Sequence, residues 1–242
     1  MNSRIVLLNL IATFLLLALV VGASATTRTV GVRVGNKFKY RPTVSWSSND
    51  TSATFPSELV DANNTEWGEF TVTGISGTNI TMQWTTHYKN GTETTMGGWV
   101  DVNTGAGNVT MFAISANLAE NDSLYTSSYN TWFINETVPR TYSSTVRDTN
   151  HLNMTSLSGT LSYRYNMYWD KSTGVLVEQL REITNQTGTY TTATSLGVQI
   201  ISSDVWTVPE FPTWTPALLI LIALTSATMV IAKQRQPKRP FR

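Results

Sequence analysis

The most frequent reactive pattern in this 242-residue sequence is Asn-x-Ser/Thr, the acceptor of N-linked glycans on exported chains. It occurs nine times, always without proline in the middle: Asn49, Asn63, Asn79, Asn90, Asn108, Asn121, Asn135, Asn153 and Asn185. The content of Asn, Ser and Thr alone predicts about half as many matches. We therefore predict that several of these asparagines carry glycans, with polar turns as the alternative interpretation.

Residue types that support catalysis are scarce. The sequence has no cysteine, which excludes disulfides, cysteine-ligated zinc, iron–sulfur clusters and cysteine nucleophiles. Its two histidines, His87 and His151, have no acid or second histidine at a ligand spacing beside them, as is typical of surface histidines. The sequence also lacks a G-x-S-x-G motif.

A glycoside hydrolase requires two acids in one cleft. The closest candidates are the pairs Glu66/Glu69 and Glu178/Glu182, whose spacing is more typical of solvated strand faces. We expect no enzyme and no cofactor. A cell-surface hydrolase is the remote alternative, and it requires these acids or the histidines to converge.

Two further patterns suggest binding of ions. Loops at Asn49-Asp50, residues 61–63 and Asn121-Asp122 offer hard oxygen ligands for Ca²⁺, but no fixed ligand spacing accompanies them, so we predict no metal site. Four basic residues fall on odd positions of one predicted strand: Arg33, Lys37, Lys39 and Arg41. Such a stripe suits anionic glycans or lipid head groups, or it protects an edge strand.

The N-terminus is predicted to be a secretory signal peptide. Residues 5–21 are an apolar run preceded by Arg4, and small residues at Ala23 and Ala25 form a cleavage-type site. We assign residues 1–25 to this signal. An uncleaved transmembrane anchor is the alternative, although a run of 17 residues is short for a bilayer.

The C-terminus is predicted to be a transmembrane helix over residues 214–232. The uncharged run 216–232 follows Trp214 and precedes five basic residues in the tail 233–242. Basic residues stay on the cytoplasmic side, so residues 26–207 lie outside the cell on a single-pass protein of the cell membrane. A buried core helix is the alternative, but the run lacks the polar face of such a helix.

Pro209, Glu210 and Phe211 stand in a proline-rich stalk, residues 208–213, just before this helix. This tripeptide, followed by an apolar helix and a basic tail, resembles the C-terminal sorting and anchoring signal of archaeal surface proteins. The resemblance covers roughly residues 208–239. It implies a sortase-like processing enzyme as a partner, with removal of the helix. A permanently retained helix is the alternative.

The predicted outside domain is mildly acidic. The formal net charge of the whole chain is +1, but the outside segment carries 11 basic and 15 acidic residues, and the basic tail offsets them. A nucleic-acid-binding domain carries a basic surface, so nucleic acid is excluded as a partner.

Residues 26–207 are predicted to form one all-β antiparallel domain, a sandwich or a curled half-barrel. Period-two alternation is typical of half-buried strands, and turn residues separate about ten short strands, with a hairpin at Asn90-Gly91. Residues 47–67 are predicted to be a loop with a helical turn near 56–61. Residues 111–125 are the one candidate for a longer helix. The predicted strands are residues 30–40, 69–73, 80–88, 98–102, 108–115, 131–138, 161–169, 175–177 and 197–203.

Two segments carry a second resemblance. Residues 31–40 (GVRVGNKFKY) and the hairpin 168–176 (YWDKSTGVL) are similar to segments of uncharacterised archaeal secreted proteins. The hairpin also looks like the late hairpin of LolA-like lipoprotein-carrier half-barrels, which implies a concave face for a lipid.

The leading hypothesis is a membrane-anchored, N-glycosylated surface protein with a structural or binding role in the envelope, whose partners are envelope glycans or other surface proteins. The alternative is a half-barrel carrier of a lipid or another apolar ligand. The two differ in whether Tyr163, Tyr165, Met167 and Trp169, which share one strand face, pack in a filled core or line an open cavity.

Overall fold

The computed structural model describes residues 27–127 and 132–206. The predicted signal peptide, the Pro209-Glu210-Phe211 motif, the C-terminal apolar run and the basic tail all lie outside these residues. Within the two described ranges, none of the helices has the length and apolarity needed to cross a bilayer. The chain divides into two compact units, Met1–Ser203 and Asp204–Arg242; in the second, the described residues form a single 3-10 turn, η2 (Asp204–Trp206).

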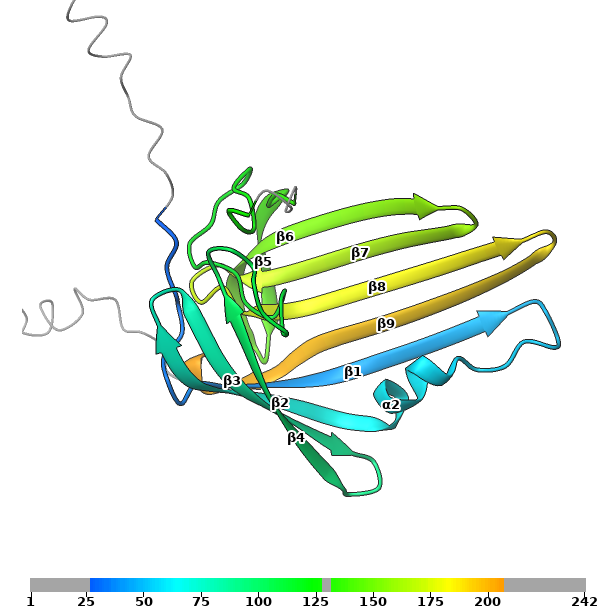
Figure 1. Cartoon of the computed structure of the whole chain (residues 1–242), viewed down its shortest axis with the longest axis horizontal. Coiled ribbons are helices and arrows are strands. Elements are labelled where there is room, and N and C mark those ends of the chain that lie inside the picture. Colours follow the sequence, from blue (N-terminus) through cyan, green and yellow to red (C-terminus); the bar gives the residue numbers. More distant parts are fainter. Residues whose placement is uncertain (1–26, 128–131, 207–242) are drawn as a thin grey trace, which may run out of the picture. The chain divides into compact units, whose positions relative to one another are not determined.

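The first unit is all-β and antiparallel, as predicted, and its nine strands belong to one open sheet (Figure 1). The strand order is β4-β3-β2-β1-β9-β8-β7-β6-β5, so β1 and β9 meet at the centre of the sheet. The strands are β1 (Lys37–Ser48), β2 (Thr65–Ser76), β3 (Asn79–Tyr88), β4 (Glu93–Asp101), β5 (Glu136–Tyr142), β6 (Thr145–Ser158), β7 (Leu161–Asp170), β8 (Leu176–Thr187) and β9 (Tyr190–Ser203).

Local sequence signals account for several of these elements. The Asn90-Gly91 hairpin is confirmed: the backbone N–H of Tyr88 donates to the carbonyl of Thr92 at 2.9 Å, and Gly91 adopts a φ of 83°. The helical turn predicted near residues 56–61 is present as η1 (Ser57–Leu59) followed by the short helix α2 (Val60–Asn64).

Other predicted elements are wrong. Residues 30–34 are not a strand, residues 108–115 contain a single isolated bridge at Ala113, and residues 111–125 are not helical. Positive φ angles at Met111, Asn117 and Asn121 prevent both a regular strand and a helix there. Strand β6 was not predicted, and β1 and β2 extend into the predicted loop 47–67.

The segment between β4 and β5 packs against one face of the sheet. We call residues 102–127 and 132–135 the covering segment, and the sheet face that it contacts the inner face. Phe112 of this segment has its ring centroid 6.1 Å from that of Tyr40 on β1 and 5.2 Å from that of Trp84 on β3. The backbone carbonyl of Met111 accepts the indole N–H of Trp169 on β7 at 2.7 Å. Because neighbouring residues reach strands from both halves of the sheet, the sheet curls around the covering segment.

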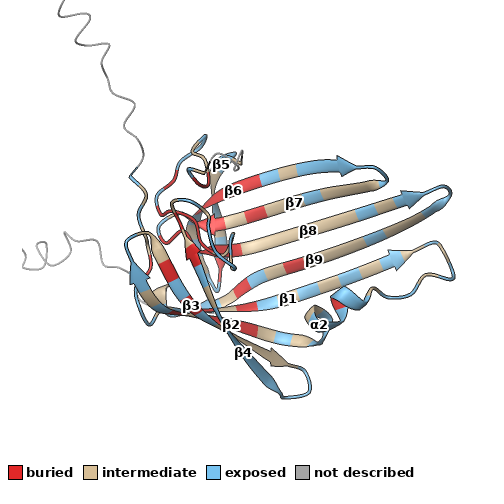
Figure 2. Ribbon diagram, in the orientation of Figure 1, coloured by how far each residue is buried: buried red, intermediate tan, exposed pale blue. Residues whose placement is uncertain are grey.

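Burial is concentrated at one end of the strands. Figure 2 shows buried residues of β6 to β9 and β1 where these strands meet the covering segment, and exposed residues at their far tips. The core at the covered end contains Ile114, Leu118, Leu124, Tyr125, Ile134, Leu152, Met167, Trp169 and Leu176. The chain leaves the sheet from this covered end, because β9 runs from the tip at Tyr190 back to Ser203.

Candidate ligand-binding face

The inner face consists of rows of side chains that run across the central strands. Successive residues of a strand point to opposite faces, so the pairing register identifies the members of each row. Under the covering segment lie two ladder pairs of the inner face, Trp169 with Leu176 and Tyr40 with Ile200. All four are at most 3 % exposed. This part of the inner face is a filled core.

Two rows nearer the tips remain partly exposed, and we call them the open half. Their members are Met154, Tyr165, Arg181, Leu196 and Val44 in the first row, and Ser156, Tyr163, Ile183, Thr194 and Trp46 in the second. Nine of these ten side chains are intermediate in exposure, and Ser156 is exposed. With five strands about 4.8 Å apart, each row is roughly 19 Å wide.

The four apolar residues of β7 that distinguish a filled core from an open cavity do not all lie in the same environment. Met167 and Trp169 are buried under the covering segment, whereas Tyr163 and Tyr165, two to six residues away on the same strand face, stay partly exposed. The alternation of inward and outward side chains in β7 was predicted correctly. The sequence does not show how far along the strand the covering segment extends.

Arg181 is the one charged side chain on the open half. Its Nε atom is buried and has no hydrogen-bond partner, and within residues 27–127 and 132–206 its guanidinium forms neither a hydrogen bond nor an ion pair. The terminal nitrogens are not among the buried unpaired atoms, so they keep contact with solvent. The adjacent charges of this region, Arg164 and Glu182, lie on the opposite face and pair with each other at 3.5 Å.

The hydroxyl groups of the flanking aromatic residues add polar character to the open half. Tyr165 lies directly across from Arg181 in the β7–β8 ladder. On β1, Trp46 forms an edge-on contact with Phe55, with ring centroids 6.2 Å apart, so the segment after β1 borders the second row. The arrangement combines aromatic and aliphatic side chains with one unpaired cation.

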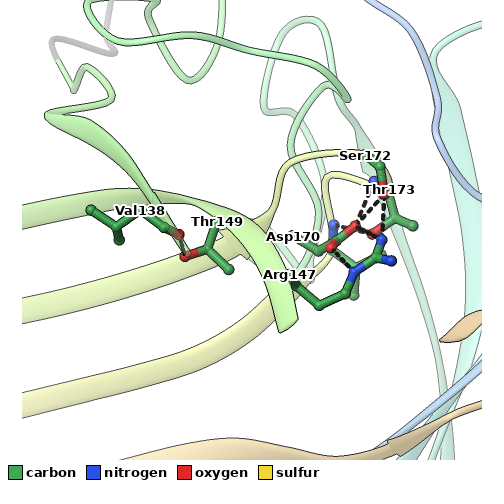
Figure 3. A network of polar contacts seen from close by, with 7 residues as sticks. Val138, Arg147, Thr149, Asp170, Ser172 and Thr173 are labelled. Atoms are coloured by element: carbon green, nitrogen blue, oxygen red, sulfur yellow. Dashed lines mark hydrogen bonds and ion pairs between the residues drawn. The ribbon is translucent and has the colours of Figure 1, made fainter. Parts of the chain in front are cut away.

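The turn between β7 and β8 supports the covered end (Figure 3). Arg147 donates from Nε and Nη2 to the carboxylate of Asp170, at 2.7 and 3.2 Å, and Ser172 and Thr173 donate to the same carboxylate. Burial raises the pKa of Asp170, but the hydrogen bonds from Arg147 and Ser172 outweigh it, so the pKa is lowered overall. The predicted turn is confirmed, while its partner Arg147 was missed together with β6.

Gly174 closes this turn against the covering segment. It adopts a φ of 72°, and a Cβ atom there would lie 2.1 Å from the carbonyl oxygen of Ile114. Gly188, at the β8–β9 tip, has a φ of 61° but open space around it. We expect Gly188→Ala to cost about 1 kcal/mol from the left-handed backbone. Gly174→Ala should cost a further 1 to 3 kcal/mol from the clash. Urea unfolding of both variants measures the difference, and equal losses would contradict the contact.

The outer face carries both histidines, far apart. His87 on β3 stacks on Trp67, with centroids 4.7 Å apart, and its nitrogens lie 3.5 Å from Glu66 and 3.0 Å from Glu93. The ammonium of Lys39 lies 3.6 Å from the centroid of the Trp67 ring. Here the structure brings one predicted acid, Glu66, to a predicted histidine.

The second histidine has the same kind of surroundings. His151 on β6 stacks on Tyr168, with centroids 4.2 Å apart, and its two nitrogens contact Glu136 at 2.9 Å and Asn166 at 3.3 Å. Arg140 lies over the Tyr168 ring. Both imidazoles are thus held by an aromatic partner directly across the ladder, a pairing that strand register alone would have shown.

The remaining acids are engaged elsewhere. Glu69 pairs with Lys37 at 3.4 Å, Glu178 with Arg140 at 2.8 Å, and Glu182 with Arg164. Five strands separate β3 from β6 in the sheet, so His87 and His151 do not meet. In the described part of the chain, neither imidazole receives a hydrogen bond from a serine or threonine hydroxyl. Each histidine is therefore engaged separately on the outer face.

In two of the loops considered for calcium, the carboxylates accept hydrogen bonds from neighbouring residues of the chain. Asp50 accepts hydrogen bonds from the backbone and hydroxyl of Ser52, which lower its pKa, and Asp122 accepts one from the backbone of Ala119. Across residues 27–127 and 132–206, no group of three or more His, Asp or Glu side chains could hold a metal.

The predicted basic stripe is divided as well. Arg33 precedes β1, Lys37 and Lys39 are engaged with Glu69 and Trp67, and Arg41 is exposed. The edge-strand interpretation is wrong, because β1 lies between β2 and β9 in the middle of the sheet.

The glycosylation candidates lie near the surface. Asn79 and Asn185 are intermediate in exposure, and the other seven asparagines are exposed. Asn49 and Asn108 donate their side-chain amide N–H groups to backbone carbonyls, at 3.1 and 3.4 Å. Sugar is attached to that amide nitrogen, so these two are less available in the folded chain than Asn63, Asn90, Asn121 and Asn153.

Comparisons with known proteins add no function. No protein-family model matches the sequence, and no curated protein is detectably similar to it. Among solved structures, an S-type phycobiliprotein lyase from Guillardia theta matches with 9% sequence identity over 70% of this chain and 88% of that chain, at a TM-score of 0.22.

Proposed function

We propose that this protein is a non-catalytic half-barrel that binds an apolar or amphipathic ligand on the open half of its inner face. The observation that supports the proposal is the unequal cover of that face. The covering segment buries Trp169 and Met167, but the next two rows, including Tyr163 and Ile183, stay partly exposed on the same strands.

The partly exposed apolar area of the open half is a source of binding energy. Each Å² of apolar surface removed from water contributes about 25 cal/mol. A contiguous set of partly exposed aromatic and aliphatic side chains is therefore a place where a ligand gains binding energy, and such sets mark binding surfaces. Trp46, Val44, Leu196, Ile183, Tyr163 and Tyr165 form such a set on four neighbouring strands.

The proposed location rests on the sequence of the two termini. We propose that the β domain is exported, glycosylated at several of the nine asparagines, and anchored by the C-terminal run. Glycan attachment at Asn63, Asn90, Asn121 and Asn153 is compatible with ligand binding, because the first three are in or beside connections and Asn153 shares strand parity with the outer face.

Photo-crosslinking of the full chain in its membrane tests the proposed function. A diazirine-bearing C16 alcohol is added, irradiated, and its adducts are mapped by peptide mass spectrometry. We expect adducts in β1, β7 and β8, and we expect Ile183→Asn to reduce them severalfold while Leu180→Asn, on the opposite face, leaves them unchanged. Adducts confined to residues 214–232 would contradict the proposal.

Intact-mass analysis of the same protein from its own membranes tests the location. We expect loss of residues 1–25 and added mass from several glycans. Removal of the C-terminal helix would appear as a further loss and would support sortase-like processing at the Pro209-Glu210-Phe211 motif. The unmodified mass of all 242 residues would contradict both the signal peptide and the glycans.

A further inference from the structure

We infer that the ligand of the open half is an anionic amphiphile whose acidic head group pairs with Arg181. The inference rests on the proposed function, because it assigns the chemistry of the ligand at that same face. Arg181 carries a charge on the inner face that the packing of the sheet does not explain.

The guanidinium of Arg181 has no partner within the described residues. Its Nε atom is excluded from solvent without a hydrogen bond, and no carboxylate compensates its charge. Burying a polar group without a partner costs free energy, and burying part of an unpaired charge costs more. The cost is relieved when an anion binds, so a bound acidic group contributes more here than at a solvated arginine.

The nearby acids cannot supply that anion. Glu182 points to the other face and pairs with Arg164, and Glu178 on that same outer face is held by Arg140 and Tyr142. Facing Arg181 from β7 and β9 are Tyr165 and Leu196, neither of which carries a charge. The unpaired cation is therefore a feature of this face and not one half of an ion pair.

The neighbours of Arg181 indicate what the rest of the ligand is made of. The cation stands in the middle of its row, with aromatic or aliphatic residues on both sides: Met154 and Tyr165 toward β6, and Leu196 and Val44 toward β1. The next row adds Tyr163, Ile183 and Trp46. A free inorganic anion would leave these side chains exposed, so the site fits an acid attached to an apolar body.

The predicted C-terminal apolar run of this chain is the other candidate occupant. Residues 216–232 contain no charged side chain, so they would cover the apolar rows and leave the guanidinium unpaired. Charge complementarity therefore favours the anionic amphiphile. The shared chemistry is one acidic group on a long apolar chain, which both fatty acids and acidic phospholipids provide.

Competition between matched probes tests the inference on the full chain in zwitterionic nanodiscs. The probes are a diazirine-bearing C16 acid, the alcohol of the same length, and an acidic phospholipid with the same labelled chain. We expect the acid to label β7 and β8 roughly tenfold more than the alcohol does, the ratio that one charge-assisted hydrogen bond gives. Labelling by the phospholipid tells whether the head group is a phosphate or a carboxylate.

Three variants identify the residue. Arg181→Gln should remove the preference for the acid and leave labelling by the alcohol unchanged, and Arg181→Lys should keep most of the preference. Arg164→Gln, which removes a paired arginine from the outer face, should change neither. The thermal midpoint of ligand-free Arg181→Gln should not fall, because no native partner is lost, and this confirms that the variant folds.

The outcomes separate the two proposals. Labelling of the inner face by acid and alcohol alike, unaffected by Arg181→Gln, overturns this inference and leaves the proposed function standing. Absence of inner-face labelling by all three probes overturns both. Labelling that appears only after deletion of residues 214–242 shows that the chain's own C-terminal run is the occupant, and also overturns the inference.

Discussion

Replacing Trp169 with alanine should lower the free energy of unfolding by about 3 to 5 kcal/mol, the range measured for large aromatic side chains in packed cores. Trp169 is 0 % exposed, and its indole N–H donates to the carbonyl of Met111 at 2.7 Å. The substitution therefore opens a cavity under the covering segment and leaves that carbonyl without its partner. Urea unfolding followed by circular dichroism measures the loss.

Trp99→Ala is the matched control for this prediction. Trp99 on β4 is 40 % exposed, so its removal should cost well under half as much. If the two variants lose similar stability, the covering segment does not bury Trp169 as described. If Trp169→Ala also abolishes ligand labelling, packing of the core is required to hold the side chains of the open half in place.

Asp170→Asn should lower stability at neutral pH by about 2 to 3 kcal/mol, because it removes a buried charge that accepts five hydrogen bonds and leaves Arg147 without its anion. The side chain of Asp170 is 1 % exposed and that of Arg147 is 24 % exposed. Removing one partner of such a pair costs more than removing both, so Arg147→Met combined with Asp170→Asn should recover part of the loss.

Protonation of Asp170 should make the folded protein less stable at acid pH. The pKa of Asp170 is lowered in the folded protein. Its contribution is therefore fully present above the unfolded value of about 3.9 and is lost as the pH falls through the lower folded value. Between pH 5 and pH 2 the wild type should lose more stability than Asp170→Asn. A control variant, Glu182→Gln, affects an exposed pair and should differ from the wild type by less than 1 kcal/mol. Parallel curves for wild type and Asp170→Asn would contradict the assignment.

Alternation of apolar residues predicted the strands whose inner positions are consistently apolar. In β7 the residues from Leu161 to Trp169 alternate without interruption, and the strand was predicted within one residue of its observed end. Strand β6 was missed because its inner positions mix Leu152 and Met154 with Asn150 and Ser156, so the period-two signal is weak. Without β6, Arg147 could not be placed beside Asp170.

The covering segment was misassigned for a different physical reason. Its apolar residues, such as Ile114, Leu118 and Leu124, fill a core and so produce short periodic patterns. The backbone that carries them turns at Met111, Asn117 and Asn121, where φ is positive in residues other than glycine. Asparagine tolerates such angles, but methionine does not favour them, so at Met111 tertiary packing imposes the angle without a local signal in the sequence.

The candidate site depends on long-range pairing, which explains why sequence alone did not identify Arg181. Its place on the inner face follows from pairing with Tyr165, and the bulge at Tyr168/Trp169 changes the parity of β8 relative to its first residues. A count from the apolar start of β8 would place Arg181 on the wrong face. The tyrosines, in contrast, were correctly grouped on one strand face.

The direction of β9 separates the open half from the point at which the chain leaves the sheet. The strand begins at the tips and ends at Ser203, so an attachment through the following residues is made at the filled end. From Leu196, in the row of Arg181, to Ser203 the strand advances about 23 Å. The row of Arg181 and the end of β9 therefore lie toward opposite ends of that strand, with the filled core between them. We propose that a ligand bound to the open half enters and leaves across the strand tips, away from the end of the sheet at which the chain continues.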